Sequence, residues 1–561
     1  MDERNMNKKK QTRRGISVIY LTMGLLLGLV IECLITVYDF SHGKWQESSP
    51  LEFASYIEEG KLELRGGATL EETDLVSRTS DASLIFHEME DWGRIELILG
   101  KPVEYDTQLE WLYAPENGSF DRFRRQEGYL VKGSEKGVIT IPDKKPGKLE
   151  LDIHGGFDLK EIRITRRVSL NQSLRGDLLK HLNVVRLGLM ALFFGLGIWL
   201  YADTWKGKRE KKLSPEKTKE SQRYVYLDAI RCLAAAMVIV VHVVQPLSQL
   251  CPFGSARYIM VVMMTAVCLC CNILFILISA ALLLPWKEEG WIEFLKKRFL
   301  KVFIPLVVYG MLYLKVCSIT EAGIGFWIPY IIRVWSTGDF TKGPHLWLVY
   351  MLLRSYLVVI PLRFMLKSMG EQSEKALTVL ILGCLTVKTY GAWVGINFGQ
   401  PMIFGEWTGV FLMGYLVNQK WMRKYDGLLL AGGAAAVLVS AYLVMKRADC
   451  IAIIANQSIL SVLMSSAMFV LLLRMDQFLK PIGTLLAAGS RYSYSVLLVH
   501  WFVLIRIVYN GWFSSDMSQY LQILLPVLLC SVVSMLLAWI MDRMVVDVIM
   551  GYRHFKKSMI E

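Results

Sequence analysis

The stretch YVYLDAIRCLAAAMVIVVHVVQ (residues 224–245) is an apolar segment long enough to cross a bilayer as one helix. Arg231 lies near one end and His242 follows eleven residues later, almost three helical turns on, so both side chains share one face. At 1.5 Å per residue they are separated by ~16 Å along the helix axis. Ionisable side chains inside a membrane helix are costly and mark functional sites. The segment therefore predicts a membrane protein whose function uses this face.

The composition of the whole chain also indicates a polytopic membrane protein. Of the 561 residues 53% are hydrophobic, the mean hydropathy is +0.37, and membrane-length apolar runs recur. A net charge of +13 would suit nucleic-acid binding, but Lys and Arg concentrate in alternate short loops, as the positive-inside rule requires. We therefore expect a lipid bilayer as a partner and no nucleic acid.

The ten cysteines argue against a disulfide-stapled module and against a metal site. None of them lies in the polar segment 40–183, so that segment is not held together by disulfides. Cys268, Cys270 and Cys271 lie in an apolar run without the partners of a metal site, which favours packing. We expect no metal and no bound cofactor.

The domain organisation follows from the apolar runs and the charges around them. The run 16–37 follows a basic stretch without a small-residue cleavage site, which indicates an uncleaved signal anchor. Loop charges place both termini in the cytoplasm and the polar region outside, with the chain in the cell membrane. The expected parts are a basic N-terminus (1–15), an anchor (16–37), an extracytoplasmic domain (40–183), a second span (184–202), a basic linker (203–223), a membrane domain (224–541) and a cytoplasmic tail (542–561).

The membrane domain is expected to hold a bundle of ten helices, which makes about twelve spans with the two that flank the outer domain. The ten lie at about 224–246, 258–285, 300–318, 345–362, 376–392, 403–418, 427–445, 457–473, 493–509 and 521–541. Residues 319–344 contain an apolar piece too short to span, which we interpret as a re-entrant or interfacial lid on the outer side.

The sequence of the outer region predicts an all-β sandwich or jelly roll. Eight short alternating or β-branched runs are separated by turn residues: 61–66, 82–88, 94–100, 107–113, 128–133, 137–142, 148–155 and 161–168. The ending KLELDIHGGFDLKEIRI (148–164) resembles the last strands of galactose-binding-like carbohydrate modules. A spacer, or a docking domain for a protein of envelope biosynthesis, remains the alternative. Trp92, Trp111 and Tyr113 are candidates for sugar contacts if exposed, with core packing as the default for each.

The run LDAIRCLAAAMVIVVH (227–242) resembles the opening helix of the membrane acyltransferase-3 family, whose motif is close to L-D-x-x-R-x-L-A-A followed by apolar residues and His. Four further stretches resemble the family's later motifs in the same order: KKRFLKVFIP (296–305), HLWLVYML (345–352), EWTGVFLMGYLV (406–417) and SYSVLLVH (493–500). The chain departs from the family pattern at Lys301, where the family has Arg, and at Leu497, where it has Tyr. Lys keeps the charge but loses the planar fork for bidentate phosphate contact.

The resemblance implies transfer of an acyl group, commonly acetyl, from cytoplasmic acyl-CoA to a hydroxyl of an extracytoplasmic acceptor. The enzyme class would be an acyltransferase that moves groups other than aminoacyl groups, and its acceptor a cell-envelope glycan such as a polysaccharide, or a lipid-linked precursor. Arg231, Arg298 and Lys301 would bind the phosphates of the donor acetyl-CoA. For Lys296 and Lys297, topology alone explains the charge. His242 is the candidate general base for O-acetylation, with a covalent acyl-histidine as the less favoured variant.

Five further residues are candidates for the acceptor site or its support. His345 and Trp347 are expected near the outer end of a span, where they could line the acceptor entrance or pack at the helix start. His500 shares a face with Ser493 and could polarise the thioester carbonyl or hold a neighbouring helix. Asp228 is expected to form a local ion pair with Arg231.

Two other function classes remain open from the sequence. One is a transporter or flippase of envelope glycan precursors, although such proteins show repeated halves and this chain shows no internal repeat. The other is a non-enzymatic membrane sensor that uses the outer β domain, although no kinase-like or cyclase-like region follows a span.

Overall fold

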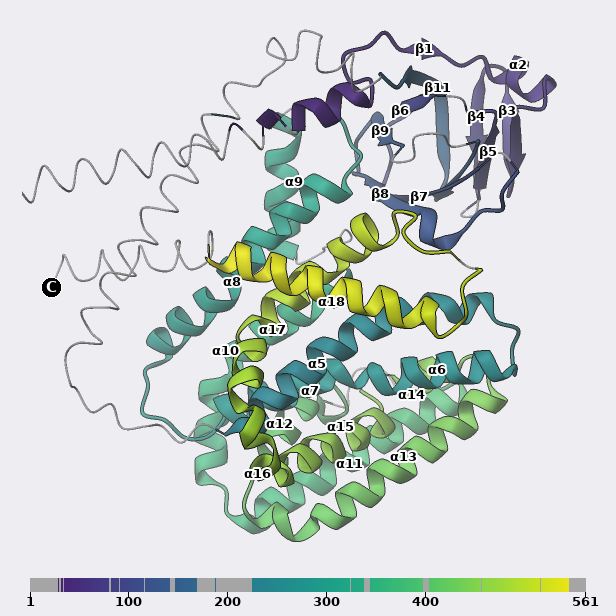
Figure 1. Cartoon of the computed structure of the whole chain (residues 1–561). Coiled ribbons are helices and arrows are strands. Elements are labelled where there is room, and N and C mark those ends of the chain that lie inside the picture. The colour runs from purple at the N-terminus through teal and green to yellow at the C-terminus, as the bar shows by residue number, and fades with distance from the viewer. Residues whose placement is uncertain are drawn as a thin grey trace, which may run out of the picture.

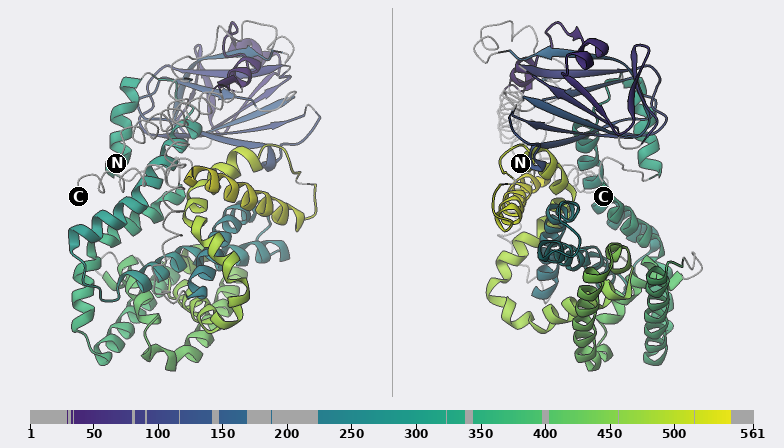
Figure 2. Two further views of the ribbon diagram at one scale, coloured as in Figure 1. Left: turned by 60° about the vertical axis from the view of Figure 1, so that its left-hand side comes forward. Right: turned by 90° about the vertical axis from the view of Figure 1, so that its right-hand side faces the viewer.

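The computed structural model describes residues 32–168 and 224–543, without positions 34, 80–81, 90, 116, 142–146, 323, 338–343, 397–402, 456 and 515, together with the single positions 29 and 187. A β domain packs on one end of a helical bundle (Figures 1 and 2). The expected anchor (16–37) lies largely outside the described residues. The expected second span (184–202) apart from position 187, the linker (203–223), the N-terminal stretch (1–15) and nearly all of the tail (542–561) also lie outside them.

The β domain consists of two antiparallel sheets that share one core. Its elements are β1 (Ser49–Pro50), α2 (Phe53–Glu58), β2 (Leu62–Arg65), β3 (Ala68–Glu71), β4 (Asp74–Ser77), β5 (Ala82–His87), β6 (Trp92–Leu99), β7 (Thr107–Ala114), η1 (Arg122–Arg124), β8 (Arg125–Leu130), β9 (Lys136–Thr140), β10 (Lys148–His154) and β11 (Phe157–Arg166). One sheet has the order β3-β4-β11-β6-β9, with β1 beside β11, and the other the order β2-β5-β10-β7-β8. From β4 onward the chain passes from one sheet to the other at each connection except that between β7 and β8, in the manner of a jelly roll.

Alternating side chains explain why these segments form a sandwich. Buried and less buried residues alternate along β6, β7, β9 and β10, because successive side chains of a strand point to opposite faces. Trp92, Trp111 and Tyr113 are all buried, so they belong to the core and are not exposed sugar-binding aromatics. The predicted fold class, a helical membrane bundle with an all-β domain, is confirmed.

The second half of the chain is almost entirely helical. Its elements are α5 (Val225–Val244), η3 (Gln245–Leu250), α6 (Ala256–Cys268), α7 (Cys270–Leu283), α8 (Trp291–Cys317), α9 (Ile324–Thr337), η4 (Pro344–Leu346), α10 (Trp347–Ser368), α11 (Glu371–Val394), η5 (Ile403–Gly405), α12 (Trp407–Val417), η6 (Trp421–Tyr425), α13 (Asp426–Lys446), α14 (Cys450–Ile454), α15 (Ile459–Arg474), α16 (Asp476–Leu479), η7 (Lys480–Ile482), α17 (Gly483–Val503), the π-helical turn η8 (Leu504–Val508) and α18 (Leu521–Met541).

Seven helical segments among the described residues are long and apolar enough to cross a membrane, and α12 and α15 are shorter apolar helices. Each of the ten expected spans overlaps a helix. The expected span 258–285 corresponds to one membrane-length segment, Ala256–Leu283, with a turn at Leu269 between α6 and α7. The expected span 403–418 contains η5 and the short α12. The segment expected as a lid forms α9, whose Tyr330 hydroxyl donates to Asp106 of the β domain at 2.9 Å.

The chain that leaves α8 inserts between the edge strands of the two sheets. Ile319 donates its backbone N–H to the carbonyl of Tyr129 on β8 at 3.0 Å, and its own carbonyl accepts from Val138 on β9 at 2.8 Å. The Ile319 side chain is 8% exposed and belongs to the core of the β domain. Gly128 leaves room for it, because a Cβ at that position would lie 2.4 Å from Ile319 Cγ2.

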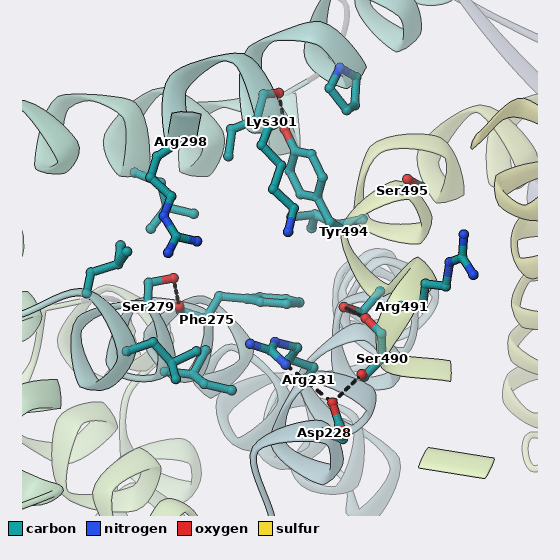
Figure 3. A pocket seen from close by; sticks show the side chains of 18 of the residues that line it. Asp228, Arg231, Phe275, Ser279, Arg298, Lys301, Ser490, Arg491, Tyr494 and Ser495 are labelled. Atoms are coloured by element: carbon teal, nitrogen blue, oxygen red, sulfur yellow. Dashed lines mark hydrogen bonds and ion pairs between the residues drawn. The ribbon is translucent and has the colours of Figure 1, made fainter. Parts of the chain in front are cut away.

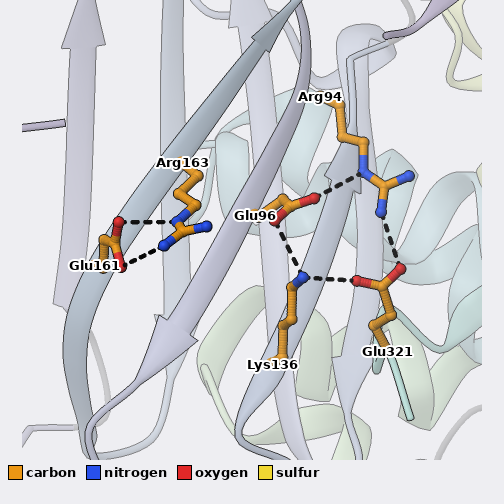
Figure 4. Close-up of polar contacts among 6 residues, drawn as sticks. All are labelled: Arg94, Glu96, Lys136, Glu161, Arg163 and Glu321. Atoms are coloured by element: carbon orange, nitrogen blue, oxygen red, sulfur yellow. Dashed lines mark hydrogen bonds and ion pairs between the residues drawn. The ribbon is translucent and has the colours of Figure 1, made fainter. Parts of the chain in front are cut away.

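An ionic network continues this junction at the surface (Figure 4). Glu321 Oε1 lies 3.0 Å from Arg94 Nη2 on β6, and Glu321 Oε2 lies 3.1 Å from Lys136 Nζ on β9. Glu96 closes the network, at 3.1 Å from Lys136 Nζ. Partial burial alone would raise the pKa of the Glu321 carboxyl. The positive charges of Lys136 and Arg94 have the larger effect and hold this pKa below its usual value. The charged form of Glu321 is therefore the one that stabilises the junction.

Replacing Ile319 by Ala should loosen the β domain on the bundle. The change opens a cavity in the shared core and should cost about 2–5 kcal/mol, because lost apolar burial and the cavity both destabilise. We expect a lower melting temperature and earlier tryptic cleavage within residues 49–166. Ile328→Ala is the matched control, since Ile328 on α9 is 53% exposed. An unchanged melting temperature for Ile319→Ala would contradict the role of this residue in the junction.

Candidate active site

Helix α5 lies at the centre of the bundle and packs against α6, α7, α17 and α18. Its apolar sequence contains neither Gly nor Pro, and Pro246 follows its end, where a proline cannot continue the α-helix. Arg231 lies in its first half, and His242 lies in its last turn, towards the β domain. One continuous helix therefore connects the two ends of the bundle that carry the candidate residues.

A cavity of about 650 Å³ lies at the Arg231 end of this helix (Figure 3). Residues of α5, α7, α8, α10 and α17 line it, together with Asp542 after α18. Four cationic side chains belong to its lining: Arg231, Arg298, Lys301 and Arg491. We call it the cationic cavity, and its size is typical of pockets for sizeable small molecules, ~300–1,000 Å³.

The floor of the cationic cavity is organised by Asp228. Its Oδ1 lies 3.3 Å from Arg231 Nη1, which confirms the expected ion pair. The Ser490 hydroxyl of α17 donates to the same carboxylate oxygen. Asp228 therefore orients the guanidinium on α5 and ties α5 to α17 (Figure 3).

Helix α8 supplies the opposite wall. Arg298 and Lys301 extend from it towards Arg231, as Figure 3 shows. Arg298 Nε is buried and has no hydrogen-bond partner among the described residues, so it can serve an anion in the cavity. The Tyr494 hydroxyl donates to the Val302 carbonyl at 2.9 Å and joins α17 to this wall.

Among the lining residues that sequence reasoning missed are Arg491 and Tyr494. Arg491 stands two residues before the SYSVLLVH stretch, and a positive charge beside that stretch was a signal that could have indicated it. Tyr494 lies within that stretch.

Three histidines from distant parts of the sequence meet at the other end of α5. The rings of His242 and His500 lie 5.2 Å apart between centroids, and those of His345 and His500 lie 4.8 Å apart. The Trp501 ring lies 5.0 Å from that of His242. His345 is 5% exposed and His500 is 0% exposed, whereas His242 is only partly buried. His242 is therefore the member of this histidine cluster that a substrate can reach.

Backbone carbonyls orient the two buried histidines. His500 Nδ1 lies 2.8 Å from the Leu497 carbonyl, and His345 Nε2 lies 3.3 Å from the Leu498 carbonyl. Because a carbonyl oxygen only accepts, each of these nitrogens must carry the proton. The other nitrogens, His500 Nε2 and His345 Nδ1, are buried without a partner among the described residues.

The remaining candidates lie elsewhere. Ser493 lines the cationic cavity, not the histidine cluster, and its hydroxyl donates to the Ser490 carbonyl at 2.9 Å. Trp347 is 38% exposed and packs against Trp407, with 5.1 Å between the ring centroids. Within the described residues no group of His, Cys, Asp and Glu is arranged to hold a metal ion.

The comparisons with known proteins give one finding about this bundle. Comparison with curated proteins gave no match, and comparison with solved structures gave none either. The family model Acyl_transf_3, an acyltransferase domain, matches residues 224–543, which is more than half of the chain and includes both the cationic cavity and the histidine cluster. The chain therefore belongs to the acyltransferase-3 family and is a membrane acyltransferase.

Proposed function

We propose that this enzyme transfers an acyl group, most simply acetyl, from cytoplasmic acyl-CoA to a hydroxyl of an extracytoplasmic glycan or its lipid-linked precursor. The observation that carries the proposal is the arrangement on α5. Arg231 faces a cavity with four cationic side chains at one end, and His242 belongs to a histidine cluster at the other.

The charge of the cationic cavity supports it as the binding site for acyl-CoA. The phosphates of CoA are anionic, and Arg and Lys at the mouth of a cavity suit them. Arg298 and Arg231 approach the cavity from opposite walls, so they can hold the phosphates between them. The cations around this cavity also favour a cytoplasmic position for this end, because basic residues accumulate on that side of membrane proteins. The β domain at the opposite end would then lie outside.

The transfer step is assigned to His242. Its imidazole takes the proton of the acceptor hydroxyl while the hydroxyl oxygen attacks the thioester carbonyl of acyl-CoA. The carbon–sulfur bond then breaks, and the sulfur of CoA leaves with the proton that the imidazolium returns. The products are an ester on the acceptor and free CoA. The ~16 Å between Arg231 and His242 along α5 is a distance that the extended pantetheine arm would cover.

Replacing His242 by Ala should abolish acyl transfer while leaving donor binding intact. General-base catalysis contributes roughly 10²–10⁴-fold, so transfer should fall by about that factor. The measurement is transfer of label from radioactive acetyl-CoA to envelope material in membranes that contain the protein. His87→Ala is the control, since His87 lies on β5 of the β domain, beside Glu63, and lines neither cavity. Near wild-type transfer by His242→Ala would exclude His242 as the base.

Replacing Arg298 by Ala should weaken binding of acetyl-CoA. Loss of a charge-assisted hydrogen bond, worth about 1.5–3 kcal/mol, corresponds to a rise in Kd of ~10-fold or more. Lys296→Ala is a matched control, because Lys296 stands on the same helix but is exposed and does not line the cavity. Calorimetric titration of each purified variant with acetyl-CoA gives its Kd. An equal loss of affinity for acetyl-CoA in the two variants would indicate a general effect of charge and not a phosphate site.

A further inference from the structure

A second, much smaller cavity lies directly beside His242, and residues of the β domain form much of its wall. Its volume is about 40 Å³, room for a hydroxyl group or a water molecule and not for a whole sugar. The bundle contributes His242, Pro246, Trp501, Ile505 and Tyr509, and the β domain contributes Arg122, Arg125, Gln126 and Glu127. We call it the hydroxyl cavity.

Hydrogen bonds hold this part of the β domain on the bundle. Arg506 of η8 donates to the Gln126 side chain at 2.8 Å and to the Glu127 carbonyl at 2.9 Å. The backbone N–H of Gly511 donates to the Phe123 carbonyl at 2.7 Å. The β-domain residues at the hydroxyl cavity are therefore fixed relative to His242.

Glu127 is the most unusual residue of this wall. It is 4% exposed, and its Oε1 is buried without a hydrogen-bond partner among the described residues. Burial raises the pKa of its carboxyl to about 6, against the opposing effects of Arg125, whose Nη2 lies 3.9 Å from Oε2, and of the Trp501 side chain. A buried carboxylate oxygen without a donor is costly, and such groups are usually completed by a ligand or water.

The same cavity contains the matching donor. Trp501 Nε1 is also buried without a hydrogen-bond partner among the described residues. The Trp501 N–H lies close enough to the Glu127 carboxyl to lower its pKa, but it makes no hydrogen bond of normal geometry with it. A hydroxyl group in the cavity that reaches both would satisfy both, because it donates to the Glu127 carboxylate and accepts from the Trp501 N–H. The Trp501 ring lies 5.0 Å from that of His242, so a hydroxyl held in this way lies beside the one that reacts.

We propose that the β domain completes the acceptor site, with Glu127 and Trp501 binding a second hydroxyl next to the hydroxyl that His242 activates. This inference rests on the proposed acyl transfer and narrows its acceptor. The preferred acceptor is a polyol with adjacent hydroxyls, such as a sugar ring, and an alcohol with one hydroxyl is used poorly. A site built to hydrogen-bond a hydroxyl discriminates strongly against an analogue that lacks it.

The first test uses the full chain in membranes and radioactive acetyl-CoA. Glu127→Gln should lower label transfer to envelope material by at least ~10-fold without changing the Kd for acetyl-CoA. Trp501→Phe keeps the aromatic ring but removes the donor, and should lower transfer in the same way. Glu150→Gln is the control, since Glu150 lies on β10 of the same sheet and accepts a hydrogen bond from Ser83. Melting temperatures show whether any variant has lost its fold.

The second test uses two small acceptors as probes, 1,2-cyclohexanediol and cyclohexanol. The wild-type protein should acetylate the diol with a kcat/KM at least ~10-fold higher, and Glu127→Gln should remove most of this preference. Equal use of the two probes, or acetylation of neither, overturns the inference.

The outcomes separate this inference from the proposed function. Transfer that survives His242→Ala contradicts the proposed function itself. Transfer that is lost in His242→Ala but unchanged in folded Glu127→Gln contradicts only the acceptor site.

Discussion

Backbone pairing between residues 318–321 and the strands β8 and β9 is the interaction on which the arrangement of the two domains depends. Ile319 hydrogen-bonds to both strands and fills the core between the sheets. Strand β8 also carries Gln126 and Glu127. The pairing that seats the β domain on α8 therefore also sets the position of the residues beside His242, and a change at this junction reaches the reaction centre through one strand.

The bundle separates its polar residues into two groups with different chemistry. Cations gather around a large cavity at one end of α5, and a mixed set of acidic, basic and aromatic side chains surrounds His242 at the other. Polar groups inside a membrane protein face its interior or a cavity, because the lipid offers them no partner. Asp228 and the carbonyls of Leu497 and Leu498 orient the groups that the two sites use.

The sequence predicted the elements of the fold well where the patterns are strong. All eight expected strands match observed ones, since alternation over several residues is a clear signal. It missed the hairpin β3–β4, whose strands have only four residues each, amid Gly, Glu and Asp residues.

The candidate site was predictable only in part. Spacing on one helix placed Arg231 and His242 on one face, but only tertiary contacts bring His500 next to His242 and His345 next to His500. Glu127 could not be found from the sequence, because it lies in a strand of a different domain and looks like any polar strand residue. For Trp347 the sequence left acceptor lining and helix packing open, and the structure shows its ring packed against Trp407.

The Ile319 junction also has a consequence for biosynthesis. The strands of the β domain leave the ribosome long before residues 318–321, and domains generally begin to fold as they emerge. Until α8 has been made and inserted, β8 and β9 expose their edge hydrogen-bonding groups, and such edges are prone to pair with other chains. During assembly of this enzyme there is therefore an interval in which the edges of β8 and β9 are unpaired, because residues 318–321 have not yet been synthesised. A chaperone that shields these edges would act in that interval.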